Sequence, residues 1–275
     1  VYKRQLASYG VSLVTLLFAE WRYVFAVCGA LVIIAAVYWF IGTSGLKKIP
    51  KVENRMDEAI QTAPTAVSGK KLVKILLISG TAALMIPIAI QGTLKDSVTQ
   101  WIPTFLEGNY NMGTSLSLLL TMVLPVINVT GAYLAKALNK KLKNELATSA
   151  AFFGIAAAFL ILLMTAGTKI AVLALICMAG ITNSMFAINV MLITMVPLHF
   201  PKYGRTGTVG GLLNAVAYIG CGLLNMGAGA ILETDDGWRA LFILWLALAA
   251  AAAIITILCV KPWKKFTHVP NSYGE

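Results

Sequence analysis

Eight apolar stretches run through the sequence, and all but the short first one have the length of a membrane-spanning helix. They cover approximately residues 6–19, 22–43, 73–106, 112–138, 146–167, 170–198, 206–232 and 238–260. About 20 residues of α-helix cross the roughly 30 Å of hydrocarbon in a bilayer. The apolar residues are continuous and do not alternate with polar ones, which predicts helices and not strands. We therefore expect an all-α, polytopic membrane protein with eight transmembrane helices.

The composition supports a lipid environment. Only 12% of the residues are charged, and 59% are hydrophobic. A soluble domain has about a quarter of its residues charged. Half that fraction does not cover a surface in water, but it suffices where lipid contacts most of the surface.

Basic residues are concentrated in alternate gaps between the apolar stretches. Eighteen of the 22 Lys and Arg residues lie in one set of gaps, namely the N-terminus, residues 44–74, 136–143 and 202–205, and the C-terminus. The other set holds Arg22, Lys95, Lys169 and Arg239. Because positively charged loops stay in the cytoplasm, this pattern predicts a multi-pass protein of the inner (plasma) membrane, with residues 44–71 and the C-terminus cytoplasmic.

One long polar segment divides the chain. Residues 44–71 contain Pro50 and Pro64, mixed charge and few large apolar residues, which is typical of a linker. We expect two helices in residues 1–43, a cytoplasmic linker at 44–71, a six-helix bundle at 72–262 and a cytoplasmic tail at 263–275.

Two spans, a linker and six spans correspond to helices 5–12 of a twelve-helix 6+6 transporter. A local motif agrees: Gly131 is followed by Lys136, Lys140 and Lys141, although Ala135 occupies its acidic position. The chain thus resembles the major facilitator superfamily, whose fold has two six-helix halves. The resemblance implies four further spans before Val1, so we expect the sequence to be truncated at its N-terminus.

A second segment resembles one branch of that superfamily. Lys95 stands six positions before Trp101, and Pro103, Phe105 and Leu106 follow. This order is similar to the seventh helix of organophosphate:phosphate antiporters, the carriers of glycerol-3-phosphate and hexose phosphates. In that branch two arginines, on helices 1 and 7, hold a phosphate. The resemblance places Lys95 at the second arginine's position, where a lysine supplies charge without a bidentate fork.

Lys95 is the leading candidate for solute contact, because charged residues within spans are costly and by default functional. In a straight helix it would lie about 31 Å from Lys74, near the outer interface. Asp96 is interpreted as a salt-bridge partner or a solvated residue. Gln91 lies one turn before Lys95 on the same helical face. The other proposed contacts with the solute are Asn128, Asn189 and Tyr218.

Other residues in the apolar stretches have structural interpretations. Amides within spans, such as Asn183 and Asn225, commonly bond between helices. His199, at the end of a span, is interpreted as structural. Bends are expected at Pro87 and Gly92 in the long stretch at 73–106. The GxxxG pattern of Gly207 and Gly211 permits close helix contact.

Several classes of chemistry find no support. No GxxxxGK[ST] motif occurs, so the chain encodes no nucleotide-driven pump. The four cysteines form no CxxC pair and are interpreted as small apolar residues. We expect no metal, no cofactor, no enzymatic activity and no nucleic-acid partner.

The sequence therefore predicts a secondary active transporter for a small anionic solute, phosphorylated or carboxylated, that works by alternating access and is monomeric at full length. The alternative is a membrane sensor for such a solute, related to the carriers. The sequence does not specify the solute, the coupling ion or the direction of transport.

Overall fold

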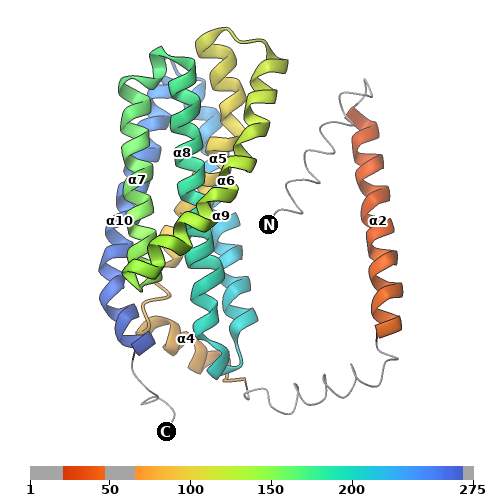
Figure 1. Ribbon diagram of the computed structural model, residues 1–275, viewed down its shortest axis with the longest axis vertical. Coiled ribbons are helices and arrows are strands. Elements are labelled where there is room, and N and C mark those ends of the chain that lie inside the picture. The colour runs from red at the N-terminus through yellow and green to blue at the C-terminus, as the bar shows by residue number, and fades with distance from the viewer. Residues whose placement is uncertain (1–20, 47–65, 269–275) are drawn as a thin grey trace. The chain divides into compact units, whose positions relative to one another are not determined.

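The computed structural model describes residues 21–46 and 66–268 (Figure 1). It divides into two compact units, Val1–Pro64 and Thr65–Glu275, which are considered separately. Every regular element in the described residues is a helix, and none of these residues forms a strand. The predicted all-α fold is confirmed.

The first unit contains the helix α2, Trp21–Leu46. Its large apolar side chains between Leu31 and Ile41 are exposed, with Leu31 at 55% and Ile41 at 66%. A helix that exposes apolar side chains on all of its faces is typical of a membrane span. It matches the stretch expected at 22–43. The expected span at 6–19 lies outside the described residues, as does most of the linker.

The second unit is a helical bundle. Its long elements are α4 (Gly69–Ile78), α5 (Met85–Tyr110), α6 (Thr114–Leu142), α7 (Glu145–Thr165), α8 (Ala171–Asn189), α9 (Thr206–Leu232) and α10 (Gly237–His268). The helix α8 continues as a π-helix over Val190–Met195 and a 3-10 helix over Val196–His199. Short 3-10 helices also cover Gly167–Lys169 and Pro201–Tyr203.

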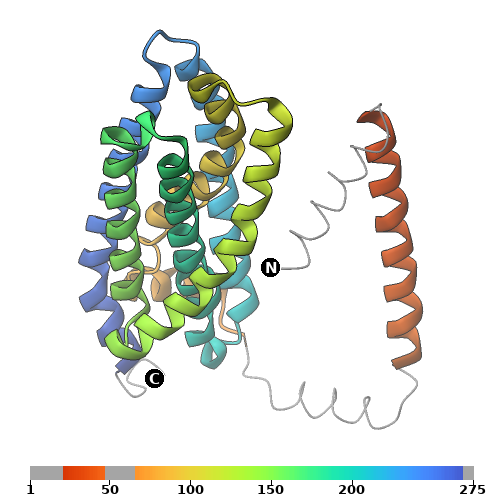
Figure 2. The same cartoon turned by 45° about the horizontal axis from the view of Figure 1, so that its top comes forward.

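The helices α5 and α8 lie at the centre of the bundle. The helix α8 packs against α5, α6 and α7, while α5 also packs against α9, α6 and α10, and α10 packs on α7. Figures 1 and 2 both show α6 crossing its neighbours obliquely. Short connections reverse the chain between successive long helices from α5 to α10, so α5 and α9 run in the same direction.

Six helices in the described residues are long and apolar enough to cross a membrane, by length and composition. They are Ala26–Ser44, Leu119–Leu142, Glu145–Thr165, Ala171–His199, Thr206–Leu232 and Gly237–Thr267. These segments correspond to six of the eight expected spans. The helix α5 has the required length but a more polar middle, which contains Gln91, Lys95 and Asp96.

The stretch expected at 73–106 is interrupted. The helix α4 ends at Ile78, and α5 begins at Met85 after a turn in which Gly80 has a φ of 76°. Glycine adopts this left-handed conformation without the steric cost of a side chain. The expected position of the bend was wrong, since the interruption precedes both Pro87 and Gly92.

The loop expected at 136–143 is also corrected. The helix α6 extends to Leu142, so Lys136, Lys140 and Lys141 are helical. The chain then turns through Lys143, which has a φ of 50°, and Asn144 caps the next helix. Lysines suit this position because cations interact favourably with the carboxyl end of a helix.

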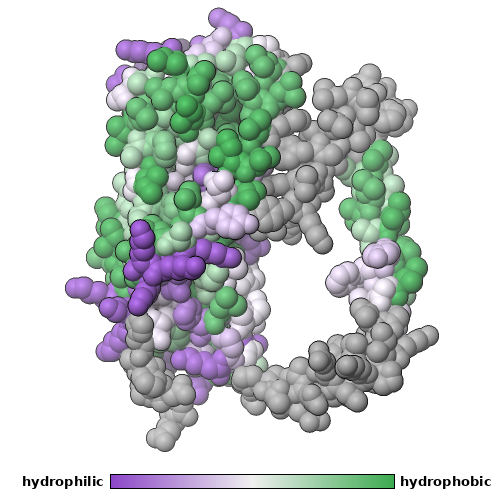
Figure 3. Space-filling model, viewed as in Figure 1, coloured by the Kyte–Doolittle hydropathy of each residue, from purple (hydrophilic) through white to green (hydrophobic). Residues whose placement is uncertain are grey.

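The fold gathers the basic residues at one end of the bundle, where α4, α7 and α9 begin and where α6 and α10 end. They are Lys70, Lys71, Lys74, Lys136, Lys140, Lys141, Lys143, Lys202, Arg205, Lys261, Lys264 and Lys265. The other end holds Glu107, Lys169, Glu233, Asp235, Asp236 and Arg239. Figure 3 shows hydrophobic side chains over the upper part of the bundle, with hydrophilic ones toward its lower part and at its top edge.

Candidate functional site

A lysine and an aspartate lie side by side in the middle of α5. The Nζ of Lys95 is 3.3 Å from the Oδ1 of Asp96, and the two side chains are 20% and 28% exposed. Their neighbours Leu94, Ser97 and Val98 are buried. Among the described residues of this unit, these two charged side chains alone lie away from both ends of the bundle. Charges in such a position are costly and by default functional.

Lys95 lies at mid-height. Its Nζ is 5.9 Å from the centroid of the Tyr218 ring on α9. At about 1.5 Å per residue, Tyr218 is about 18 Å from the start of α9 and about 21 Å from its end. Because α9 is one of the candidate spans, Lys95 is near the middle of a span. The position near the outer interface, which assumed one straight helix from Lys74, does not hold because α4 and α5 are separate.

Two glycine contacts hold α5 against α9 at this height. Gly92 lies against the backbone of Ala217, and Gly220 lies against Ala89. Small residues at such positions let two helix backbones approach closely. The contact brings Tyr218, which is half exposed, within reach of Lys95.

Gln91 is fully buried one turn before Lys95. Its Nε2 donates a hydrogen bond to the Met185 carbonyl oxygen on α8 at 3.0 Å. Its Oε1 is buried and has no hydrogen-bond partner in the structure. Most buried polar atoms are paired, so an acceptor of this kind calls for a donor from a water or a ligand.

Asn128 ties α6 to α8. Its Oδ1 accepts a hydrogen bond from the Thr182 hydroxyl at 3.0 Å, and both side chains are buried. One residue further along α8, the Nδ2 of Asn183 donates to the Thr130 hydroxyl at 3.0 Å. The expectation that span amides bond between helices is confirmed for these two. It is wrong for Asn225, whose Nδ2 contacts the Cys221 sulfur on its own helix at 3.3 Å.

Asn189 is the last residue of α8 and is half-buried. It lies one turn beyond Met185, whose carbonyl oxygen binds Gln91, and the π-helix follows it directly. π-Helical turns occur frequently at functional sites. The structure therefore groups Lys95, Gln91 and Tyr218 on α5 and α9, and it places Asn128 and Asn189 along α6 and α8.

The family model of the Major Facilitator Superfamily matches residues 6–225. The chain belongs to this superfamily. The match extends from the first apolar stretch into α9 and includes α5 with Lys95. Members of the superfamily are in general membrane transporters and not enzymes, so the general interpretation as a transporter is confirmed. No curated protein matches the chain.

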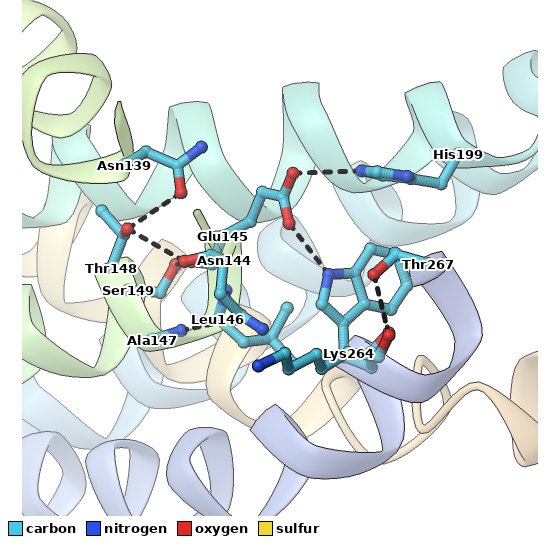
Figure 4. Close-up of polar contacts among 11 residues, drawn as sticks. Asn139, Asn144, Glu145, Leu146, Ala147, Thr148, Ser149, His199, Lys264 and Thr267 are labelled. Carbon is cyan, nitrogen blue, oxygen red and sulfur yellow. Dashed lines mark hydrogen bonds and ion pairs between the residues drawn. The ribbon is translucent and has the colours of Figure 1, made fainter. Parts of the chain in front are cut away.

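A second polar cluster in this superfamily member lies at the basic end of the bundle (Figure 4). The Oε1 of Glu145 is 3.0 Å from the Nε2 of His199, and its Oε2 accepts a hydrogen bond from the Trp263 indole at 2.9 Å. Glu145 begins α7, His199 follows α8 and Trp263 lies near the end of α10. One carboxylate thus joins three elements, and His199 takes part in this contact.

The residues next to Glu145 in the sequence fix its place at the start of α7. The Oδ1 of Asn144 accepts hydrogen bonds from the backbone N–H groups of Leu146 and Ala147, as an N-cap does. An acidic residue in the first turn is also favoured by the helix dipole. These signals locate the start of α7, but the partners of Glu145 lie 54 and 118 residues away, and the sequence analysis missed the cluster.

The transporter also has a groove between α6 and α8, with a volume of about 390 Å³. Its lining is apolar, from Leu120 and Val123 on α6 to Leu175 and Ile176 on α8, with Asn183 as the polar exception. It lacks a charged group, so it does not fit an anion. The polar residues of α5 and α9 remain the better candidate.

In the part of the chain that the structure describes, no three His, Cys, Asp or Glu residues lie close enough together to bind a metal ion. Cys177 and Cys259 are buried among apolar side chains, and Cys28 and Cys221 are half-buried. All four described cysteines are free thiols.

Proposed function

We propose that this transporter is a secondary active carrier of a small anionic organic solute that bears a phosphate or carboxylate group. Transport would proceed by alternating access, in which two bundles expose a central site to one side at a time. The observation that carries the proposal is the position of Lys95 at mid-height of the bundle, beside Tyr218. A cation there attracts an anion to the place where such carriers bind their substrates.

The neighbouring residues supply orientation. Gln91 offers a buried acceptor without a partner, which suits a hydroxyl or N–H group on the solute. The Tyr218 ring lies beneath the Lys95 ammonium group and keeps it at this height. Asn128 and Asn189 are proposed as further polar contacts along α6 and α8. The similarity of the Lys95–Leu106 segment to organophosphate:phosphate antiporters supports a phosphate group as the anion.

The architecture and orientation of the carrier are part of the proposal. The bundle from α4 to α10 would be the C-terminal six-helix half, with α4 and α5 together forming one crossing. The helix α2 would be the last helix of the other half. The basic end would face the cytoplasm of a cell bounded by the plasma membrane.

Uptake into proteoliposomes tests the proposal. The probes are radiolabelled inorganic phosphate, glycerol 3-phosphate and lactate. Lys95→Ala should abolish uptake of the transported probe at unchanged expression, and Lys95→Arg should retain part of it. Lys74→Ala, which removes an exposed lysine of α4, is the matched control. Unchanged uptake by Lys95→Ala would contradict the proposal.

The alternative function is a sensor for the same class of solute. It shares the binding residues but requires no flux. Saturable binding of a probe to the purified protein without uptake into proteoliposomes would favour the sensor, whereas uptake that saturates at the same concentration would favour the carrier.

A further inference from the structure

The last helix, α10, is longer than the hydrocarbon layer that it would cross. It runs from Gly237 to His268, and no charged residue lies between Arg239 and Lys261. At about 1.5 Å per residue these two residues are about 33 Å apart, close to the roughly 30 Å of hydrocarbon in a bilayer. Lys261 would therefore lie at the edge of the hydrocarbon, and the last turns of α10 would enter the layer of lipid head groups.

Three lysines share one face of these last turns. Lys264 and Lys265 follow Lys261 by three and four residues, so the three side chains leave the helix on the same side, and all three are exposed. Toward the middle of the helix, the same face carries exposed apolar side chains, which are Ile254, Ile257 and Leu258. We call these six residues the α10 stripe. It is apolar over one turn and basic over the next.

Aromatic rings on the buried side of α10 mark the same level. Phe266 stacks on Tyr203 with the ring centroids 6.3 Å apart, and it contacts Trp263 at 5.6 Å. The Nζ of Lys202 lies 5.1 Å from the centroid of the Phe266 ring. Trp and Tyr are enriched where a membrane meets water, and lysine side chains reach toward that interface. The aromatic cluster therefore agrees with head groups at the height of the three lysines.

The three lysines have no acidic partner in the described part of the chain. The ion pairs there join Lys95 to Asp96 and His199 to Glu145. Glu145 is the one described acid at this end, and its two oxygens already contact His199 and Trp263. Like charges one turn apart on a helix repel one another. An anion that enters among the lysines would relieve this repulsion.

We propose that the α10 stripe binds an anionic phospholipid, with the phosphate among Lys261, Lys264 and Lys265 and an acyl chain along the apolar part. Orientation in the membrane requires basic charge at this end, but it does not require that charge to line up with exposed apolar side chains. A stripe that is charged at one end and apolar along its length fits a lipid. The helix lies at the edge of the bundle in both views (Figures 1 and 2). The lipid is distinct from the transported solute, and its site does not include Lys95.

Lipid binding to the protein purified in a neutral detergent tests the proposal. The probes are dioleoyl phosphatidylglycerol, which is anionic, and dioleoyl phosphatidylcholine, which is zwitterionic, and native mass spectrometry gives the dissociation constant of each. The unaltered protein should bind phosphatidylglycerol more tightly. Each lysine beside anionic head groups contributes about fivefold to affinity at low salt. The triple variant Lys261→Gln, Lys264→Gln and Lys265→Gln should therefore lose roughly a hundredfold for this lipid.

Two further variants separate loss of the site from loss of the fold. The single change Lys265→Gln should weaken phosphatidylglycerol binding by about fivefold. The triple change of the same three lysines to Arg keeps their charge and should retain most of the affinity. The thermal midpoint of each variant without added lipid shows whether it is folded.

The matched control removes the same charge from another helix at the same end. It is the triple variant Lys136→Gln, Lys140→Gln and Lys141→Gln on α6, whose affinity for phosphatidylglycerol should fall by less than fivefold. Equal losses in the two triple variants would show diffuse attraction to the whole basic end and would overturn the proposal. Equal affinity of the unaltered protein for the two lipids would also overturn it. Displacement of phosphatidylglycerol by inorganic phosphate would show a simple anion site instead of a lipid site. These outcomes leave the role of Lys95 untouched, so the proposed function stands or falls separately.

Discussion

Gly92 on α5 lies so close to Ala217 on α9 that a Cβ atom built on Gly92 would be 2.3 Å from the Ala217 carbonyl oxygen. The contact is reciprocated, since a Cβ on Gly220 would be 2.6 Å from the Ala89 carbonyl oxygen. Backbone atoms occupy both positions, so neither helix can yield by turning a side chain. The two glycines therefore set the distance between the helices that carry Lys95 and Tyr218.

Gly92→Ala should force α5 and α9 apart. Overpacking of this kind costs about 1–3 kcal/mol of stability. We expect a lower thermal midpoint for the purified protein in detergent, and reduced probe uptake because Lys95 and Tyr218 separate. Gly211→Ala on α9 is the matched control, since a Cβ there meets nothing within 4 Å. Equal thermal midpoints for Gly92→Ala and Gly211→Ala would show that the contact at Gly92 does not set the distance between α5 and α9.

Glu145 should contribute to stability through its two partners at the basic end. Glu145→Ala leaves the His199 ring and the Trp263 indole without their acceptor, and each loss of this kind costs about 1–3 kcal/mol. Glu145→Gln keeps one side-chain oxygen and should lose less. Thermal unfolding should rank the proteins as unaltered, Glu145→Gln and Glu145→Ala, in order of falling midpoint.

A control variant distinguishes the loss of the Glu145 contacts from a general effect of removing a negative charge. Asp235→Ala removes an exposed carboxylate at the opposite end and should leave the midpoint within the range of ordinary surface substitutions, about 0.5 kcal/mol. A Glu145→Ala protein as stable as Asp235→Ala would show that the contacts of Glu145 contribute nothing measurable.

The apolar stretches predicted the helices well because burial in lipid acts on each segment separately. The expected spans at 146–167 and 206–232 match α7 and α9 within two residues at each end. Contacts between distant residues were not predictable in this way. The GxxxG pattern pointed to Gly207 and Gly211, but a Cβ on either meets nothing within 4 Å. The close approach lies at Gly92 and Gly220, and it depends on which helices meet.

The candidate site was likewise predictable from the sequence only in part. A charge in an apolar stretch identified Lys95, and helical spacing placed Gln91 on its face. The height of Lys95 was not predictable, because it depends on the turn at Gly80 between α4 and α5. The bond between Asn128 and Thr182 joins residues 54 positions apart, so the sequence did not show which amide is already paired.

We expect the hydrogen bond between Asn128 and Thr182 to stabilise the packing of α6 against α8. Thr182→Val preserves the shape of the side chain but leaves the Asn128 Oδ1 without its donor, which costs about 1–3 kcal/mol. Thr165→Val is the control, because the Thr165 hydroxyl is exposed and bonds to its own helix. In a double-mutant cycle, Asn128→Ala and Thr182→Val should show coupling in thermal stability.

Uptake kinetics show whether Asn128 also contacts the solute. If it does, Asn128→Ala should raise the KM for the transported probe beyond the change caused by Thr182→Val. Equal KM values in the two variants would restrict Asn128 to its role between α6 and α8. If the stability losses of Asn128→Ala and Thr182→Val simply add in the double variant, the two residues do not interact, which contradicts the proposed hydrogen bond between α6 and α8.

The basic end of the bundle should face the cytoplasm. Twelve Lys and Arg residues lie there against one acidic residue, Glu145, in the described part of the bundle. Because translocation of basic segments is disfavoured, this asymmetry predicts the orientation. In a background without the four native cysteines, Lys140→Cys should react with a membrane-impermeant maleimide in inverted vesicles and not in intact cells. Asp235→Cys should react in intact cells. The reverse pattern would place the basic end outside and contradict this orientation.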